Sequence, residues 1–207
     1  MAAALLDFAA IGAADAPAQP FPYLVAHDLL RPADAEALTE DFPDVEASGL
    51  LPDSTLRLSP LLSRLAAELR GPEMAAALGK KFGVDLARLP TMLTVRSRCA
   101  AKDGRIHTDS ENKAVTLLFY LNPNWRQEGG RLRLLRSGDD LEDYIAEVSP
   151  EAGTLVAFRR SENSWHGHHP FVGTRRYLMV NWMRGERVAW YEQMRHKIAA
   201  GLKGVFA

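Results

Sequence analysis

The sequence predicts a mainly β fold with some α-helix, in which helices near the N-terminus pack on one sheet of a β-sandwich or jelly roll. Apolar residues recur at helical spacing in the first part of the chain, and many short β-rich segments follow from Leu89 onward. The composition, 47% hydrophobic and 25% charged over 207 residues, is that of one globular domain with a sizeable core.

The N-terminal part is expected to supply the helices. Three prolines, Pro17, Pro20 and Pro22, separate residues 1–19, expected to be a flexible arm, from a single domain over residues 20–207. Proline at a first helical turn and glycine at a C-terminal cap delimit the helices. The predicted elements are a strand over 21–26 and helices over 32–42, 61–70 and 72–82.

The second half of the chain is expected to form the β core, over about residues 89–183. Runs rich in β-branched and aromatic residues alternate with turn signals such as Asn122-Pro123-Asn124 and Gly129-Gly130. The predicted strands cover residues 92–96, 114–121, 131–135, 144–148, 154–158 and 176–183, and a final helix is predicted over 186–200.

A His-Thr-Asp triplet at 107–109 is the candidate start of a metal site. Alternate residues of an extended strand point the same way, so His107 and Asp109 can bind one ion together. His166 would complete two histidines and one carboxylate, the ligand set of non-haem Fe(II) oxygenases. Such triplets also occur by chance, and a solvated turn is the competing interpretation.

The second histidine ligand has competitors. His168 and His169 follow closely, and any of the three histidines satisfies the pattern by residue type. We favour His166, because it follows a turn-like segment and lies nine residues before Arg175. His166 and His168 would share one face of a strand, whereas His169 would point away.

Arg175 is the candidate anchor for a carboxylate, because a guanidinium can form a forked, charge-assisted pair of hydrogen bonds with it. Neighbours in a strand face opposite sides, so only one of Arg175 and Arg176 can point inward. Tyr120 is a candidate second contact through its hydroxyl, and an ordinary core tyrosine is the competing interpretation.

Bulk properties exclude several classes of function. A net charge of -1, without long basic runs, argues against a broad nucleic-acid surface. The single cysteine, Cys99, excludes an internal disulfide and fits a reducing compartment. No apolar run is long enough to span a membrane. We therefore expect a cytoplasmic monomer or homodimer that binds neither nucleic acid nor membrane.

The segment from His107 to Met183 resembles the double-stranded β-helix (jelly-roll) core of the prolyl-4-hydroxylase-like Fe(II)/2-oxoglutarate-dependent oxygenases. Residues 20–43 also look like the strand-and-helix opening of these enzymes. The matching core stretches are HTD (107–109), FYLNPNW (119–125), GGRLRLL (129–135), GTLVAFRRSENSWHGHHP (153–170) and GTRRYLMVNW (173–182).

The resemblance implies roles for the candidate residues. His107, Asp109 and His166 would bind Fe(II), Arg175 would bind the far carboxylate of 2-oxoglutarate, and Tyr120 would support it. Dioxygen would be the second cosubstrate and ascorbate an activator. The implied reaction is hydroxylation of an unactivated C–H bond, with decarboxylation of 2-oxoglutarate to succinate.

One stretch departs from the family pattern. Many relatives carry a tyrosine on the strand before the H-x-D loop, within R-Y-x-x-G, whereas this chain reads TVRSRCAAKDGR over 94–105. The contact made by that tyrosine is expected to come from Arg96, Ser97 or Arg98.

The primary substrate is not named by the sequence. We favour a small molecule or sugar, and a protein substrate with a prolyl-type target is the alternative. An anionic small molecule would suit five basic residues expected at the mouth of the barrel, namely Arg96, Arg98, Arg159, Arg160 and His168.

Two other classes of function compete with the oxygenase. A non-catalytic jelly-roll binding module would leave the His/Asp set structural or vestigial. A zinc hydrolase can use two histidines and a carboxylate, but no glutamate base accompanies them and Arg175 would be unexplained.

Overall fold

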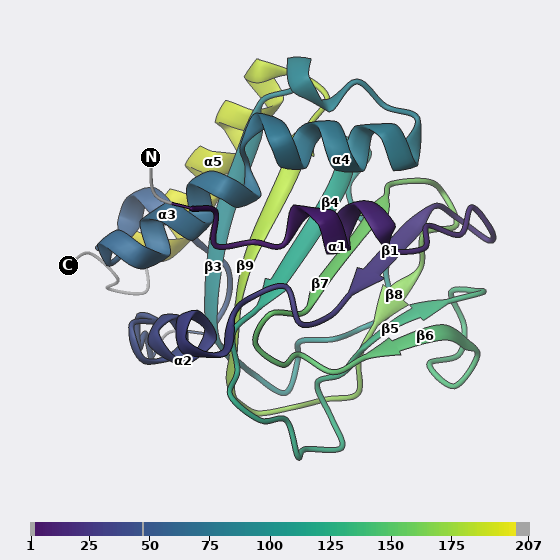
Figure 1. Ribbon diagram of the computed structural model, residues 1–207. Helices are drawn as coiled ribbons and strands as arrows, with labels where there is room; N and C mark the ends of the chain where they lie inside the picture. The colour runs from purple at the N-terminus through teal and green to yellow at the C-terminus, as the bar shows by residue number, and fades with distance from the viewer. Residues whose placement is uncertain (1–2, 47, 202–207) are drawn as a thin grey trace.

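The computed structural model describes residues 3–46 and 48–201. Within this part of the chain, six strands form a large sheet in the order β1-β7-β4-β9-β3-β2, and three form a small sheet in the order β6-β5-β8 (Figure 1). Neighbouring strands in both sheets are antiparallel. The predicted jelly roll with N-terminal helices on one sheet is confirmed.

The elements follow the predicted order closely. The large sheet contains β1 (Tyr23–Ala26), β2 (Leu51–Pro52), β3 (Thr91–Cys99), β4 (Lys113–Tyr120), β7 (Leu155–Arg159) and β9 (Gly173–Met183). The small sheet contains β5 (Leu132–Leu135), β6 (Tyr144–Val148) and β8 (His166–Gly167). The helices are α1 (Phe8–Ala13), α2 (Pro32–Glu40), α3 (Pro60–Leu69), α4 (Pro72–Phe82) and α5 (Glu186–Gly201), with 3-10 turns η1 (Asp53–Thr55) and η2 (Leu86–Arg88).

Local sequence signals set the helix ends. Ser59 caps α3 by accepting a hydrogen bond from the Leu62 amide at 3.1 Å, and Pro60 occupies the first turn. Gly83 ends α4 in the left-handed conformation, with φ 63°, which glycine adopts without steric cost.

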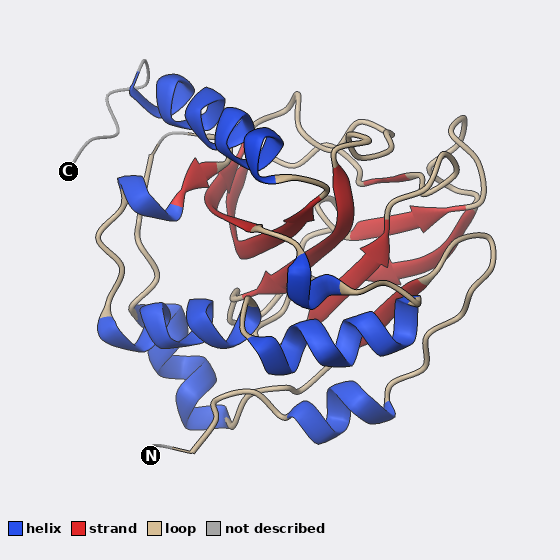
Figure 2. Ribbon diagram, turned by 90° about the horizontal axis from the view of Figure 1, so that it is seen from above, coloured by secondary structure: helices blue, strands red, loops and turns tan. Residues whose placement is uncertain are grey.

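The strands of the large sheet have two apolar faces. On β4, Leu117 and Phe119 belong to the cluster beneath the helices, whereas Leu118 and Tyr120 belong to a second cluster shared with the small sheet. Figures 1 and 2 show α1, α3 and α4 covering the first face. The second face, enclosed by the small sheet, is where the candidate residues gather.

The N-terminal segment differs from the flexible arm expected over residues 1–19. Leu5, Leu6 and Ile11 are buried in the helix-covered core. The Leu5 and Leu6 amides donate to the Glu68 carboxylate of α3 at 2.9–3.0 Å. Three apolar side chains and a charge-assisted contact therefore fix residues 5–13 to the body. The prediction of a separate arm relied on the three prolines that follow, which do not report on these contacts.

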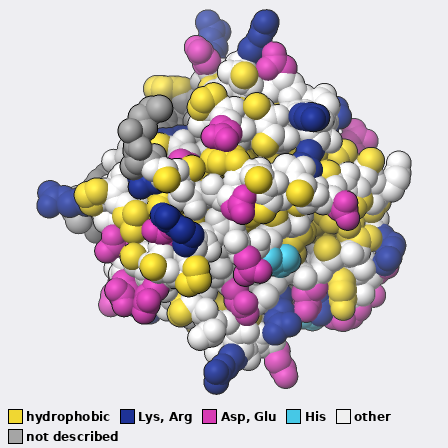
Figure 3. Space-filling view, viewed as in Figure 1, with side chains coloured by type: hydrophobic (Ala, Val, Ile, Leu, Met, Phe, Trp, Pro, Cys, Tyr) yellow, Lys and Arg dark blue, Asp and Glu magenta, His cyan; other side chains and the backbone are white. Residues whose placement is uncertain are grey.

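None of the described helices is long and apolar enough to cross a membrane. On the face shown in Figure 3, acidic and basic side chains are interspersed among apolar ones.

Candidate metal centre and anion pocket

The fold brings His107, Asp109 and His166 together. Their candidate ligand atoms all lie within 4.8 Å of one another. His107 and His166 form a reciprocal pair of backbone hydrogen bonds, both 3.0 Å, across an isolated bridge. Residues 107–109 do not form the continuous strand that we expected; the bridge to β8 positions the triplet instead.

Hydrogen bonds select the tautomer of both histidines. His107 Nδ1 lies 2.8 Å from the Arg105 carbonyl, and His166 Nδ1 lies 3.0 Å from the Ser164 carbonyl. Because a carbonyl only accepts, each Nδ1 carries a proton, and Nε2 is the ring atom that is left to bind a metal ion. A histidine that binds a metal in a protein typically donates its other ring N–H to a carbonyl in this way.

The Asp109 carboxylate is buried and kept ionised. Burial raises its pKa, but Lys113 Nζ, 2.6 Å from one oxygen, and the Thr116 hydroxyl, which donates to the other at 2.5 Å, bring it down to about 2. Burial lowers the pKa of His166 to about 4. At neutral pH Asp109 is therefore a carboxylate and His166 a neutral imidazole, the protonation states in which these residues bind a divalent ion.

Arg175 forms the opposite end of the site. It is 2% exposed, and its Nε donates to the Gly130 carbonyl at 2.7 Å while Nη2 donates to the Tyr120 hydroxyl at 3.1 Å. The Tyr120 hydroxyl thus accepts from Arg175 and retains its own proton for a ligand. Burial raises the pKa of Tyr120 to about 12, so it stays a donor. Arg176 points away, to the Thr39 carbonyl of α2.

A cavity of about 290 Å³ connects the two ends. His107, Asp109 and His166 line one end, and Arg175 lines the other. Apolar side chains between them are Leu118, Leu132 and Met179. A metal-binding donor set and a buried cation in one cavity fit a metal-chelating ligand that also carries a carboxylate.

Of the three candidates for the missing tyrosine contact, Arg96 lines the cavity. Ser97 instead donates to the Pro43 carbonyl, and Arg98 pairs with Asp44. Tyr177, which also lines the cavity, escaped the sequence analysis. The signal was present, because Tyr177 lies two residues after Arg175 on the same strand and must share its face.

The prediction of five basic residues at the mouth of the barrel is only partly correct. Arg96 and His168 line the cavity, but Arg159 donates to the Phe82 carbonyl at the end of α4. Arg160 donates to the Asp109 carbonyl. Three further basic residues from the two segments that flank the H-x-D triplet also line the cavity, namely Lys102, Arg105 and Lys113.

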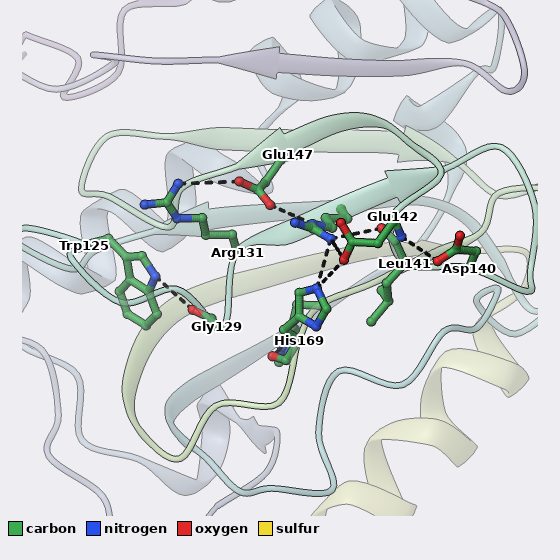
Figure 4. Close-up of polar contacts among 10 residues, drawn as sticks. Trp125, Gly129, Arg131, Asp140, Leu141, Glu142, Glu147 and His169 are labelled. Carbon is green, nitrogen blue, oxygen red and sulfur yellow. Dashed lines mark hydrogen bonds and ion pairs between the residues drawn. The ribbon is translucent and has the colours of Figure 1, made fainter.

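His169 lies outside the cavity, as its alternation with His168 predicted. Its Nε2 is 2.7 Å from Glu142 and 3.0 Å from Arg133 Nη1, in a polar network on the small sheet (Figure 4). His168 is buried in the cavity wall, and burial lowers its pKa to about 4.

The fold of this chain is similar to those of several solved structures. A prolyl-4-hydroxylase from Pseudomonas putida is similar, with a TM-score of 0.57 and 22% identity over 79% of this chain and 88% of that one. A viral collagen prolyl hydroxylase from Paramecium Bursaria Chlorella virus-1 gives 0.54 and 14% identity, over 79% and 96%. A Phytophthora capsici prolyl 4-hydroxylase gives 0.52 and 22%, over 81% and 60%. At these identities the likeness shows the shared fold.

No curated protein sequence matches the chain. Residues 97–184 match the family model described as the 2OG-Fe(II) oxygenase superfamily. That segment contains the whole His-Asp-His triad and Arg175, and together they imply Fe(II) and 2-oxoglutarate as cofactors. This segment of the chain therefore resembles the 2OG-Fe(II) oxygenase superfamily, and it carries an intact His-Asp-His triad.

Proposed function

We propose that this protein is a hydroxylase of the prolyl type, acting on a residue of a peptide or protein. The observation that carries the proposal is a short cavity with a His-Asp-His triad at one end and a buried arginine at the other. The triad would hold Fe(II), and Arg175 with Tyr120 would hold the far carboxylate of 2-oxoglutarate. Iron and 2-oxoglutarate, when bound, would activate dioxygen, so that one oxygen atom enters a C–H bond of the substrate and the other enters succinate as 2-oxoglutarate loses carbon dioxide.

Other residues orient the metal-ligating side chains and form the walls of the cavity. Thr116 and Lys113 fix the plane of the Asp109 carboxylate, and the two backbone carbonyls fix the imidazole rings. Leu118, Leu132 and Met179 give the cavity apolar walls. Such preorganised walls keep the reactive centre from being quenched by solvent.

The size of the cavity favours a substrate that reaches in from outside. At about 290 Å³ it is at the lower limit of small-molecule sites, and 2-oxoglutarate would take much of that room. A single side chain or ring of a peptide needs little further space. The similar structures named as prolyl hydroxylases favour the same choice, so we place the peptide substrate ahead of the small molecule or sugar expected from the sequence.

The proposal is tested by incubating the protein with Fe(II), 2-oxoglutarate, ascorbate and a panel of proline-containing peptides. We expect succinate to form and one or more peptides to gain the mass of one oxygen. Matched peptides with alanine in place of proline are the control and should remain unmodified.

Hydroxylation of the alanine-substituted peptides at another residue would refute the prolyl target. Succinate formation stimulated by small sugars or acids, and by no peptide, would refute the peptide class altogether. The His166→Ala variant separates enzymatic product from the background oxidation that free iron causes.

A further inference from the structure

The carboxylate end of the cavity carries a second set of donors beside Arg175 and Tyr120. In the register of the large sheet, Arg96 of β3 lies opposite Tyr177 of β9, and Tyr177 lies opposite Tyr120 of β4. Arg175 precedes Tyr177 by two residues and shares its face. These four side chains, which we call the anion floor, therefore form one continuous surface across three strands.

Ring contacts hold the anion floor together. The guanidinium carbons of Arg175 and Arg96 lie 5.1 and 5.9 Å from the centre of the Tyr177 ring. The Tyr120 and Tyr177 rings meet edge to face, with centres 5.7 Å apart. Two arginines and two tyrosines thus stack at one end of a buried cavity, an arrangement that fixes their polar atoms before any ligand arrives.

The Arg96–Tyr177 pair has unused donors. Arg96 Nη1 donates to Asp103 at 2.6 Å and approaches Cys99 Sγ at 3.5 Å, but its buried Nε has no hydrogen-bond partner in the described part of the chain. The Tyr177 hydroxyl likewise has none among the described residues, although Tyr177 is only 6% exposed. Because Arg96 and Tyr177 both line the cavity, the guanidinium and the hydroxyl are placed to meet a ligand there.

Charge balance indicates what that ligand carries. The anion floor holds two guanidiniums, and the only carboxylate of a described residue that pairs with either of them is Asp103. One positive charge is left at the end of a low-dielectric cavity, where an unpaired charge is unfavourable. One incoming carboxylate restores neutrality, and Arg96, Tyr177 and Arg175 all line the cavity that it would enter.

We propose that Arg96 and Tyr177 bind the far carboxylate of 2-oxoglutarate together with Arg175 and Tyr120. This inference rests on the proposed use of 2-oxoglutarate at this site. The Arg96–Tyr177 pair takes the place of the tyrosine that relatives carry on the strand before the H-x-D loop. Because Asp103 belongs to that loop, Arg96 also ties the bound carboxylate to the segment that carries His107.

The test is calorimetric titration of the Mn(II)-loaded protein, which binds the cosubstrate without turnover. We expect Arg96→Met to weaken 2-oxoglutarate binding by about 10- to 100-fold and Tyr177→Phe by about 5- to 20-fold, as loss of hydrogen bonds to a charged group predicts. Arg96→Lys should recover part of the loss. The parallel ligand is 2-oxopentanoate, which has the same chain length and keto acid but no far carboxylate. Its affinity should change by less than about twofold in either variant.

Arg98→Met and Tyr144→Phe are the matched controls, on the same strand and on an exposed strand, and should bind 2-oxoglutarate as the unaltered protein does. Unchanged 2-oxoglutarate affinity in both Arg96→Met and Tyr177→Phe overturns the inference and assigns the pair to the primary substrate. Equal weakening of both ligands also overturns it, because the pair would then act on the keto acid end or on folding. Absence of 2-oxoglutarate binding by the unaltered protein refutes the proposed function instead.

Discussion

Two polar clusters flank β8, and they differ in whether their charges are already satisfied. In the network on the small sheet, Arg133 donates to Glu142 and Glu147, both at 2.6 Å, and His169 completes the set (Figure 4). In the cavity on the other side, Arg175 and Arg96 retain unused N–H groups, and His107 and His166 present free Nε2 atoms. Counting satisfied partners separates a structural network from a binding site more reliably than counting charged residues.

The two clusters also differ in how far their side chains are exposed to solvent. The Glu142 and His169 side chains of the network are 62% and 44% exposed, so water screens their interactions. His166 and Arg175 are 6% and 2% exposed. A free donor or lone pair in the buried cluster is therefore expected to matter for ligand binding, whereas the exposed pairs add modest stability.

The largest effect on cosubstrate binding is expected from Arg175→Met. Removing the buried guanidinium should weaken 2-oxoglutarate binding by about 100-fold or more, because a forked, charge-assisted contact is lost. Arg176→Met is the matched control, since Arg176 points to Thr39 on the other face of β9. Calorimetry with the Mn(II)-loaded protein measures both affinities. Equal losses of 2-oxoglutarate affinity in the two variants would mean that Arg175 and Arg176 do not lie on opposite faces of β9.

Acid stability of the metal-free protein gives an intermediate effect. Burial lowers the pKa values of His166 and His168 from 6.5 to about 4, so the unfolded chain binds protons between these values while the folded chain does not. Stability is therefore complete above about pH 6.5 and falls as the pH drops toward 4, by about 1.4 kcal/mol per pH unit for each histidine. Asp109, with its pKa lowered to about 2, contributes to acid sensitivity only below that window.

Urea unfolding at several pH values, with a chelator present, measures this slope. His168→Asn should reduce it by about half, because one of the two buried imidazoles no longer titrates. A slope that is the same in this variant would show that His168 is solvated in the folded protein.

The smallest effect is expected from the satisfied network. Arg133→Met should lower the midpoint of thermal unfolding by about 2–4 °C and change 2-oxoglutarate affinity by less than about twofold. Calorimetry and thermal unfolding on the same preparation provide both numbers. A large loss of cosubstrate affinity would show that the two clusters are coupled through β8.

Sequence patterns predicted the layers and the metal ligands because both depend on local spacing. The alternation of β4 and β9 and the H-x-D triplet are visible within a few residues. The anion floor depends on register, since Arg96, Tyr177 and Tyr120 meet only when β3, β9 and β4 pair. The buried arm at Leu5 and Leu6 and the two-residue β8 were also beyond prediction, because both depend on contacts with distant segments.

The most direct test of the account is anaerobic titration of the protein with Fe(II) and 2-oxoglutarate, followed by the weak visible charge-transfer band of the chelated cosubstrate. His166→Ala and His169→Ala are the matched pair, one from each cluster. We expect a band in the unaltered protein and in His169→Ala, and no band in His166→Ala. Bound metal without a band in the unaltered protein, or an undiminished band in His166→Ala, would contradict it.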